Sequence, residues 1–329
     1  CGTSLSSHEV ALGYRKVEED AVIIRFKVKS EQKIGSWSTT EDTYILGWTT
    51  TPWTLPGNVA LAVNPKLSYS ILRSNTSMNR GLVDGEEYMI PGHYIVASSR
   101  VPDLTREGDV FVHEETKNVN GHHLVGLEYE PLFDIPILKN ESSFHVYAAD
   151  FVLETEGTGV VHTAVMYGED DYALGERVGL PKQHTVGLDG KFLPHTGDLA
   201  GLYVKAPETQ KALFDFLKSS RVLYQTHKYT HDYPFCWRCD SPLLYYAKDS
   251  WFVAMTKVKD ELLKNAEQIT WVPAHIKEGR FGEWISGVKD WAISRERYWG
   301  TPLPVWRCQN TNYEIRITNY ELRKSAMRN

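Results

Sequence analysis

Short runs of alternating apolar and polar residues, spread over residues 21–165, constrain the fold more than any other feature. In the first run Ile24, Phe26 and Val28 alternate with charged residues, as in a strand with one buried face. Gly, Pro, Asn and Asp separate the runs, which is typical of turns between strands. The further candidate strands are residues 44–48, 59–63, 69–72, 94–97, 109–113, 145–148 and 159–164. We therefore expect a compact β-rich domain here.

Helical patterns become convincing only after residue 205. Pro207 suits the first position of a helix, and Leu213, Phe216 and Leu217 mark one apolar face. A second helix is expected near residues 257–269, and the i, i+3, i+4, i+7 spacing predicts another near residues 281–288. The chain is therefore expected to be mixed α/β, with a helix-rich C-terminal segment.

Charge and hydropathy exclude two classes of function. The 329 residues, enough for two domains, carry 36 Lys and Arg against 42 Asp and Glu, a net charge of −6. No overall basic field attracts nucleic acid, so any nucleic-acid site must be local. No apolar run approaches the roughly 20 residues of a membrane helix, and the start of the chain lacks a signal-peptide layout. We expect a cytoplasmic chain with no membrane partner.

The sequence Thr-Thr-Thr-Pro-Trp-Thr-Leu-Pro-Gly-Asn begins at Thr49, where a predicted strand ends. The hydroxyls of Thr49, Thr50 and Thr51 meet two prolines that stiffen the backbone. Hydroxyls and peptide N–H groups can thereby be held in fixed directions, without a helix or sheet using them, to orient a water and a carbonyl. Three threonines alone are more typical of an ordinary strand-to-loop transition. The attached Pro-Trp-Thr-Leu-Pro favours a functional site over this ordinary transition.

A second segment, residues 156–172, joins a short buried strand to acidic residues. Gly157 and Gly159 allow a tight turn into a strand that carries His162, and three consecutive acids follow at residues 169–171. A carboxylate there suits a cationic group. Taken singly, His162 is more typical of a structural histidine. The three acids are likewise more typical of a solvent-exposed loop or helix start.

The cysteines favour metal binding over disulfides, since four is too few for a disulfide framework in a chain of this size. Cys236 and Cys239 form a C-x2-C pair, a spacing that lets two thiolates of one tight turn bind Zn²⁺. A buried reduced pair and a redox motif are the alternatives.

Together, residues 49–58, 157–171 and 290–304 resemble isoleucyl-tRNA synthetase, and the resemblance covers nearly all of residues 1–308. The valyl and leucyl enzymes are similar in the second and third segments but usually place Arg-Pro after two threonines. Thr51-Pro52-Trp53 therefore points to isoleucine.

The resemblance implies a function in proofreading. A pocket for isoleucine excludes valine by one methylene, worth about 1–3 kcal/mol, and this enzyme family is the standard illustration of that limit. The family adds a β-barrel-rich editing domain, inserted in a class I Rossmann-type core, that hydrolyses valine from the 3′ end of tRNA(Ile). By this resemblance residues 1–20 are a zinc-site linker, 21–225 the editing domain and 226–308 the returning catalytic domain. Residues 309–329, in which a six-residue pattern at 311–316 recurs once at 318–323, are an atypical tail.

The resemblance also implies roles for single residues. Asp171 matches the acid that grips the α-ammonium of the amino acid, and we expect it to stay ionised. Thr49, Thr50 and Thr51 match the strip that contacts the terminal adenosine and the ester. The residues that match the amino-acid pocket are Trp53, Thr54, Asn58 and His162. Because no Ser-His-Asp or Cys-His constellation is evident, we expect a positioned water rather than a covalent intermediate.

The family's zinc site and its synthetic chemistry are only partly represented. Cys1, Cys236 and Cys239 match three of four zinc ligands, and the fourth is expected upstream of Cys1. After Cys308 the sequence departs from the family's second cysteine pair. The H-I-G-H and K-M-S-K-S signatures are absent, so ligation of isoleucine with ATP and Mg²⁺ is not expected from these residues alone. We expect a monomer.

Two other hypotheses fit these residues. The first is a valyl- or leucyl-type editing domain, which the identity of the released amino acid would distinguish. The second is a non-catalytic tRNA-binding or zinc-stabilised structural module, in which Asp171 and the threonines have only structural roles.

Overall fold

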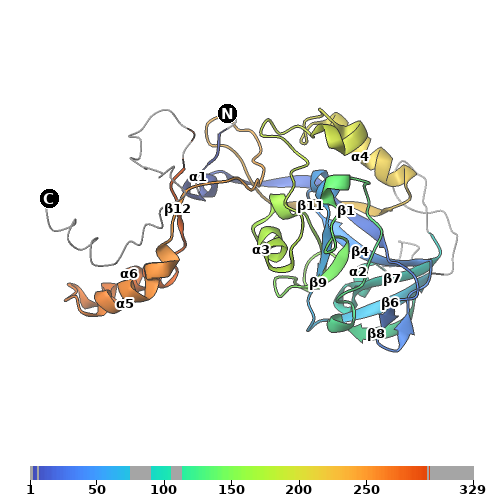
Figure 1. The fold of residues 1–329 in the computed structure, drawn as a ribbon, viewed down its shortest axis with the longest axis horizontal. Coiled ribbons are helices and arrows are strands. Elements are labelled where there is room, and N and C mark those ends of the chain that lie inside the picture. Colours follow the sequence, from blue (N-terminus) through green and yellow to red (C-terminus); the bar gives the residue numbers. More distant parts are fainter. Residues whose placement is uncertain (1–2, 6, 75–89, 105–112, 295, 297–329) are drawn as a thin grey trace, which may run out of the picture. The chain divides into compact units, whose positions relative to one another are not determined.

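The computed structural model describes all residues except 1–2, 6, 75–89, 105–112, 295 and 297–329 (Figure 1). The strands of the central sheet are β1 (Tyr14–Lys27), β4 (Thr43–Thr49), β5 (Ala60–Val63), β6 (Ser68–Ser74), β7 (Gly92–Ala97), β8 (His113–Asn120), β9 (His145–Ala148), β10 (Val160–Thr163) and β11 (Leu223–Pro234). They run in the order β8-β6-β7-β4-β10-β5-β9, and β1 pairs with both β4 and β11. The pairs β4/β7, β4/β10 and β5/β9 are parallel and the others antiparallel, so the described part of the chain has a mixed sheet.

The remaining elements are short. The α-helices are α1 (Ser7–Ala11), α2 (Val101–Leu104), α3 (Glu169–Val178), α4 (Pro207–Ser219), α5 (Lys259–Glu267) and α6 (Arg280–Ser286). The 3-10 helices are η1 (Pro52–Gly57), η2 (Ser98–Arg100), η3 (Gly121–His123), η4 (Pro136–Leu138), η5 (Val165–Tyr167), η6 (Pro194–Leu199), η7 (Met255–Val258) and η8 (Ala274–Ile276). Two small ribbons pair β2 (Lys33–Ile34) with β3 (Trp37–Ser38) and β12 (Phe252–Val253) with β13 (Trp291–Ala292).

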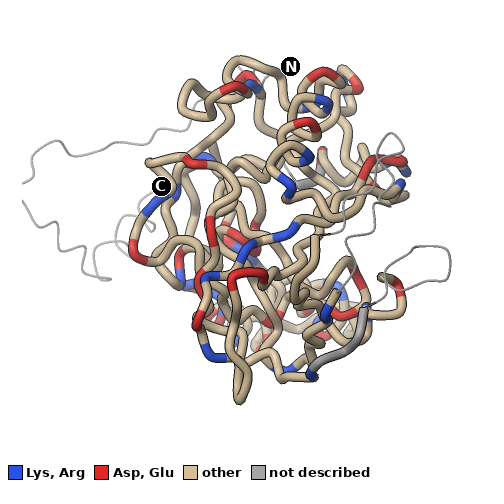
Figure 2. Tube along the Cα trace, turned by 90° about the vertical axis from the view of Figure 1, so that its right-hand side faces the viewer, with Lys and Arg blue, Asp and Glu red and all other residues tan. Residues whose placement is uncertain are grey.

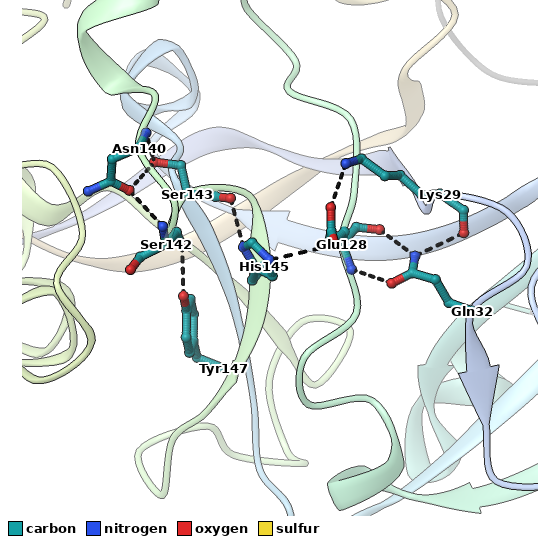
Figure 3. Close-up of polar contacts among 8 residues, drawn as sticks. All are labelled: Lys29, Gln32, Glu128, Asn140, Ser142, Ser143, His145 and Tyr147. Carbon is teal, nitrogen blue, oxygen red and sulfur yellow. Dashed lines mark hydrogen bonds and ion pairs between the residues drawn. The ribbon is translucent and has the colours of Figure 1, made fainter.

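The sheet curls because one extended segment bridges two of its strands. Val28, just after β1, pairs with Tyr129, and the adjacent Glu128 pairs with His145 of β9. Side chains reinforce the seam: Gln32 exchanges hydrogen bonds of 2.8 and 2.9 Å with the backbone of Glu128, and Lys29 forms an ion pair with its carboxylate (Figure 3). The chain is mixed α/β, as the sequence predicts, and its curled sheet agrees with the barrel-like domain that the resemblance implies.

Strand β1 supplies both a confirmation and a correction. Ile24, Phe26 and Val28 face the main core, as their alternation predicts. Arg25, expected on a solvent face, is only 2% exposed. Its guanidinium donates to the carbonyls of Leu223 and Arg221 and lies beside tyrosine rings from β7 and β11. Alternation correctly predicts which face of β1 each side chain is on. The prediction that the Arg25 face is exposed to solvent is wrong, because a second cluster of buried side chains covers that face.

Most predicted elements are found. Strands occur at the candidate positions, except that residues 109–112 lie outside the described residues, as does the predicted tail. Helix α4 begins at Pro207 as predicted, and η7 precedes a shorter α5. The expected domain boundaries at 20/21 and 225/226 fall inside β1 and β11, and the division into domains stays a prediction.

The two glycines before β10 adopt the left-handed conformation that the sequence suggests. Gly157 has φ 58° and Gly159 has φ 70°. A Cβ at Gly159 would lie 2.3 Å from the Cβ of Ala97, whereas a Cβ at Gly201, φ 81°, would meet nothing within 4 Å. The turn therefore needs glycine at residue 159 for both backbone and space.

We expect Gly159→Ala to lower the free energy of unfolding by about 2–4 kcal/mol, because strain at positive φ adds to the overlap with Ala97. Gly201→Ala is the matched control, which carries the strain alone and should lose about 1–2 kcal/mol. Urea denaturation followed by fluorescence compares the two variants. Equal losses would show that the contact with Ala97 does not constrain the turn.

Candidate functional site

The two motif segments meet at one edge of the sheet. Strands β4 and β10 are parallel neighbours, with Val161 opposite Trp48. Because the carboxyl ends of parallel strands lie at the same edge, the residues that follow β4 and those that follow β10 leave the sheet side by side. The first group is the threonine run with η1, and the second is η5 with α3. Segments more than 100 residues apart thus form one candidate site.

The threonine run folds into a hydrogen-bonded turn that opens η1. Thr49 Oγ1 accepts from the Thr51 N–H at 3.0 Å and lies 3.2 Å from Thr51 Oγ1. Thr54 Oγ1 donates to the Thr51 carbonyl at 2.8 Å. The expectation that no helix uses these groups is wrong, because Pro52 at the first helical position favours a 3-10 helix in which the Thr54 N–H also donates to the Thr51 carbonyl.

His162 joins the threonine turn from the neighbouring strand. Its side chain is buried, and Nε2 lies 3.0 Å from Thr54 Oγ1. Burial lowers the pKa of His162 to about 4, so the imidazole is neutral at physiological pH. Its other ring nitrogen, Nδ1, is buried with no hydrogen-bond partner among the described residues. One ring nitrogen of His162 therefore has a hydrogen-bond partner within the fold, whereas the other has none among the described residues.

Asp171 differs from the two acids that precede it. Glu169 and Asp170 are exposed in the first turn of α3, whereas Asp171 is half-buried. Its Oδ2 accepts a 2.9 Å hydrogen bond from the Ala164 N–H. Burial raises the pKa of Asp171 to about 7, although the bond from Ala164 acts in the opposite direction. The expectation that this carboxyl stays ionised is thus corrected: without a cation, protonated and ionised forms coexist near neutrality.

Two pocket candidates are held mainly by buried tyrosines. Trp53 is buried, with its ring centre 5.3 Å from that of Tyr167. Asn58 donates through Nδ2 to the Ala60 carbonyl at 3.0 Å and accepts through Oδ1 from the Tyr129 hydroxyl at 2.8 Å. Both ends of this amide are engaged, so Asn58 fixes the end of η1, and its contact with a substrate stays a prediction.

Sequence reasoning missed Tyr167 and Tyr129. The Tyr167 hydroxyl accepts from the N–H groups of Thr185 and Val186 at 2.7 and 2.8 Å, which ties η5 to a distant loop. Its position next to the acidic residues 169–171 was the only local signal. Tyr129 lies in no motif that we identified, since its role comes from the bridging segment.

An open pocket adjoins the threonine run. It lies between β1, the start of η1 and α4, and its lining residues are Glu19, Asp20, Thr50, Pro52, Trp53, Val204, Lys205, Ala206, Thr209, Gln210 and Leu213. Lys205 forms an ion pair of 3.1 Å with Glu19, and Gln210 donates to Asp20 at 2.9 Å. The structure thus brings Thr50 and Trp53 to this pocket, while His162 and Asp171 are not part of its wall.

The C-x2-C pair lies in a tight turn after β11. Asp240 N–H donates to the Cys236 carbonyl and Cys236 N–H to the Ser241 carbonyl, both at 2.9 Å. Cys236 is buried and Cys239 exposed. Hydrogen bonds from the side chain and backbone of Ser241, and from Cys236, lower the pKa of Cys239 to about 6.

The other cysteines, Cys1 and Cys308, lie outside the described residues, as does most of motif 290–304. Within the described ranges no cluster of three or more His, Cys, Asp or Glu residues could hold a metal. The two thiols of the turn fit half of a tetrahedral zinc site.

Basic and acidic residues are interspersed along the described chain (Figure 2). No helix among the described residues is both long and apolar enough to cross a bilayer.

Comparison with known proteins gives consistent matches. Residues 1–328 match the family model of the class I tRNA synthetases (I, L, M and V). The chain is 45% identical over 327 residues to the isoleucine–tRNA ligase of Clostridium novyi, covering 99% of this chain and 28% of that protein. It is 41% identical over 317 residues to the enzyme of Picrophilus torridus, covering 95% and 27%. The chain therefore spans under a third of the length of these relatives.

Among solved structures, the editing domain of the P. knowlesi cytosolic leucyl-tRNA synthetase matches with a TM-score of 0.42 and 12% identity. The match covers 65% of this chain and 97% of that one.

Proposed function

The chain belongs to the class I tRNA synthetases for isoleucine, leucine, methionine and valine. We propose that the domain formed by its curled sheet is an editing domain, which hydrolyses the ester bond between mischarged valine and tRNA(Ile). The similarity to isoleucine–tRNA ligases favours isoleucine as the cognate amino acid and valine as the one removed. A protein with the full length of these relatives would join isoleucine to tRNA(Ile) with ATP and Mg²⁺ in the cytoplasm.

One observation carries the editing proposal: the threonine run leaves β4 beside the end of the parallel strand β10, where the Asp171 carboxyl of α3 accepts from the Ala164 N–H. An ester of valine presents an ammonium, a carbonyl and a ribose to such a site. Asp171 suits the ammonium, because a carboxylate and a cation attract strongly where water is partly excluded. The threonine hydroxyls suit the ribose and an attacking water.

Hydrolysis at this site needs no covalent intermediate. The water oxygen bonds to the valine carbonyl carbon, and the bond to the ribose oxygen breaks as that oxygen takes up a proton. The chain's contribution is to hold the ester and the water in reacting positions and to donate hydrogen bonds to the developing oxyanion. Thr49, Thr50 and Thr51 are the proposed donors and positioning groups.

The test is the hydrolysis of valyl-tRNA(Ile) and isoleucyl-tRNA(Ile) by this chain, at protein concentrations high enough to offset weak binding. We expect valine to be released and isoleucine to be retained. If the tRNA binds and neither ester is cleaved, the proposal is wrong and the chain is a binding or structural module. Preferential release from mischarged tRNA(Val) or tRNA(Leu) would assign it instead to a valyl- or leucyl-type editing domain.

We further propose that Cys236 and Cys239 provide two thiolates to a structural Zn²⁺, with Cys1 as a third ligand. Gly13, just before β1, accepts a hydrogen bond from the N–H of Phe235, just after β11, so the start of β1 and the end of β11 lie together. A metal bound by Cys1, Cys236 and Cys239 would link these two ends. The alternative, a reduced pair without metal, leaves the same turn intact.

We expect Cys236→Ser and Cys239→Ser each to reduce the affinity for Co²⁺ by at least about 10-fold, because each removes one thiolate ligand. Absorbance of the Co²⁺–thiolate charge-transfer band during titration measures this loss. Cys308→Ser is the control and should leave the titration unchanged. An unaltered titration in both turn variants would contradict the zinc assignment.

A further inference from the structure

We propose that His162 Nδ1 accepts a hydrogen bond from the α-ammonium of the bound aminoacyl group, beside the Asp171 carboxylate. The inference rests on the proposed editing function and adds to it a second ligand for the ammonium. It follows from the tautomer that the threonine turn imposes on His162.

The tautomer is determined by counting hydrogens. A threonine hydroxyl has a single proton, and Thr54 Oγ1 donates it to the Thr51 carbonyl at 2.8 Å, an acceptor that cannot donate in return. At the 3.0 Å contact with His162 Nε2, a Thr54 hydroxyl that donates to this carbonyl can only accept. With the hydroxyl in that orientation, the imidazole carries its proton on Nε2. Since a neutral imidazole has one N–H, Nδ1 is left as an acceptor.

That acceptor lacks a partner among the residues that the structure describes. His162 is 6% exposed, so bulk water does not satisfy Nδ1 either. Native proteins rarely leave a buried polar atom unpaired, and such exceptions are concentrated at sites that a ligand or an ordered water completes. The indole N–H of Trp53, the residue before Thr54, is a second buried group without a partner in the described chain. One unpaired group thus lies on β10 beside Thr54 of η1, and the other lies on η1, where the Trp53 ring packs against Tyr167.

The position of Asp171 favours an ammonium as the missing donor. The Ala164 N–H that holds Asp171 Oδ2 is two residues beyond His162. The rise of a strand is about 3.3 Å per residue, so the two backbone positions are about 7 Å apart. An ammonium placed between them can donate one N–H to Nδ1 and another to Asp171. A cation there also favours the ionised form of the carboxyl more strongly than a ribose hydroxyl does, because the ammonium adds a net positive charge to its hydrogen bond.

The experiment is ¹⁵N NMR of the chain with labelled histidine, with and without 3′-deoxy-3′-(valylamido)adenosine, a probe in which an amide replaces the ester. In the free protein we expect a protonated Nε2 and an unprotonated Nδ1 at His162. At saturation with the probe, the Nδ1 resonance should shift as for an accepted hydrogen bond, while Nε2 stays unchanged. The matched probe with a hydroxyl in place of the α-amine should produce a much smaller shift.

A protonated Nδ1 in the free protein, or no shift at saturation with the valyl probe, would overturn the proposal even if valyl-tRNA(Ile) is hydrolysed. Equal shifts from both probes would also overturn it, because a hydroxyl donor would then suffice. Failure of hydrolysis, by contrast, counts against the editing function and is measured separately.

Two variants separate the ring nitrogens. His162→Asn keeps an acceptor near Nδ1, and His162→Gln keeps a donor near Nε2. We expect the Gln variant to bind the valyl probe at least about 10-fold more weakly than the Asn variant, since only the latter retains the acceptor. The reverse order of affinities, with both variants folded by circular dichroism, would contradict the role of Nδ1.

Discussion

Asp171→Asn is expected to lower kcat/KM for the hydrolysis of valyl-tRNA(Ile) by about 10²–10³-fold, a loss typical of removing one preorganised charged or polar contact. Asparagine keeps the shape of the side chain and an acceptor for the Ala164 N–H. It loses the charge that pairs with the ammonium. Release of radiolabelled valine over a range of tRNA concentrations measures kcat and KM separately.

The titration of the Asp171 carboxyl also predicts the pH dependence of the wild-type reaction. Burial raises the pKa of Asp171 to about 7, and the carboxylate that binds the ammonium is the form present above that pKa. We therefore expect kcat/KM to rise as the pH increases toward 7, and to fall again at higher pH once the substrate's α-ammonium, with an ordinary pKa of about 8, loses its proton. In Asp171→Asn this rise should disappear, which a profile of the variant would show.

The stability of the fold should respond in the opposite sense. The folded-state pKa of Asp171 lies above the value of 3.8 for an exposed aspartate, so between these values the unfolded chain binds fewer protons than the native one. The contribution of this group to stability falls as the pH rises through that window. Asp171→Asn removes the effect, and at pH 8 we expect it to unfold at equal or higher urea than the wild type.

Asp170→Asn is the matched control, because its side chain is exposed one residue earlier in the same helical turn. It should keep wild-type hydrolysis within about 2-fold, since exposed charges are screened by water and salt. If both variants lose activity equally, the general acidity of the helix start matters rather than the buried carboxyl of Asp171.

Arg25→Ala is expected to lower the free energy of unfolding by about 3–5 kcal/mol. The substitution leaves a cavity between two layers, and the carbonyls of Leu223 and Arg221 lose their donor. The cation–π contacts with Tyr94 and Tyr224 are lost as well. Urea denaturation measures the change.

Lys27→Ala is the control for Arg25, since it removes a cation two residues along β1 whose side chain is 44% exposed and pairs with Glu130. An exposed pair contributes about 0–1 kcal/mol, so this variant should unfold near the wild-type midpoint. A loss below about 1 kcal/mol in Arg25→Ala would mean that its carbonyl and aromatic contacts do not hold β1 to β11.

The sequence predicts the local structure of this chain well because local forces determine it. Alternation predicts the inward face of β1 at Ile24 and Phe26, and proline at residue 207 predicts where α4 begins. The two glycines at residues 157 and 159 predict a tight turn before β10, where both have positive φ. Motifs likewise identify the candidate site residues, since motif matching needs no coordinates.

The state of those residues was decided only by the tertiary structure. The contact between Thr54 and His162 joins positions 108 residues apart, and the proposed tautomer of the imidazole rests on it. Burial at the end of β10 raises the pKa of Asp171, and the bridging segment supplies the tyrosine that engages Asn58. Pattern and propensity describe neighbours along the chain, whereas protonation, burial and hydrogen-bond satisfaction depend on neighbours in space, which only the folded sheet brings together.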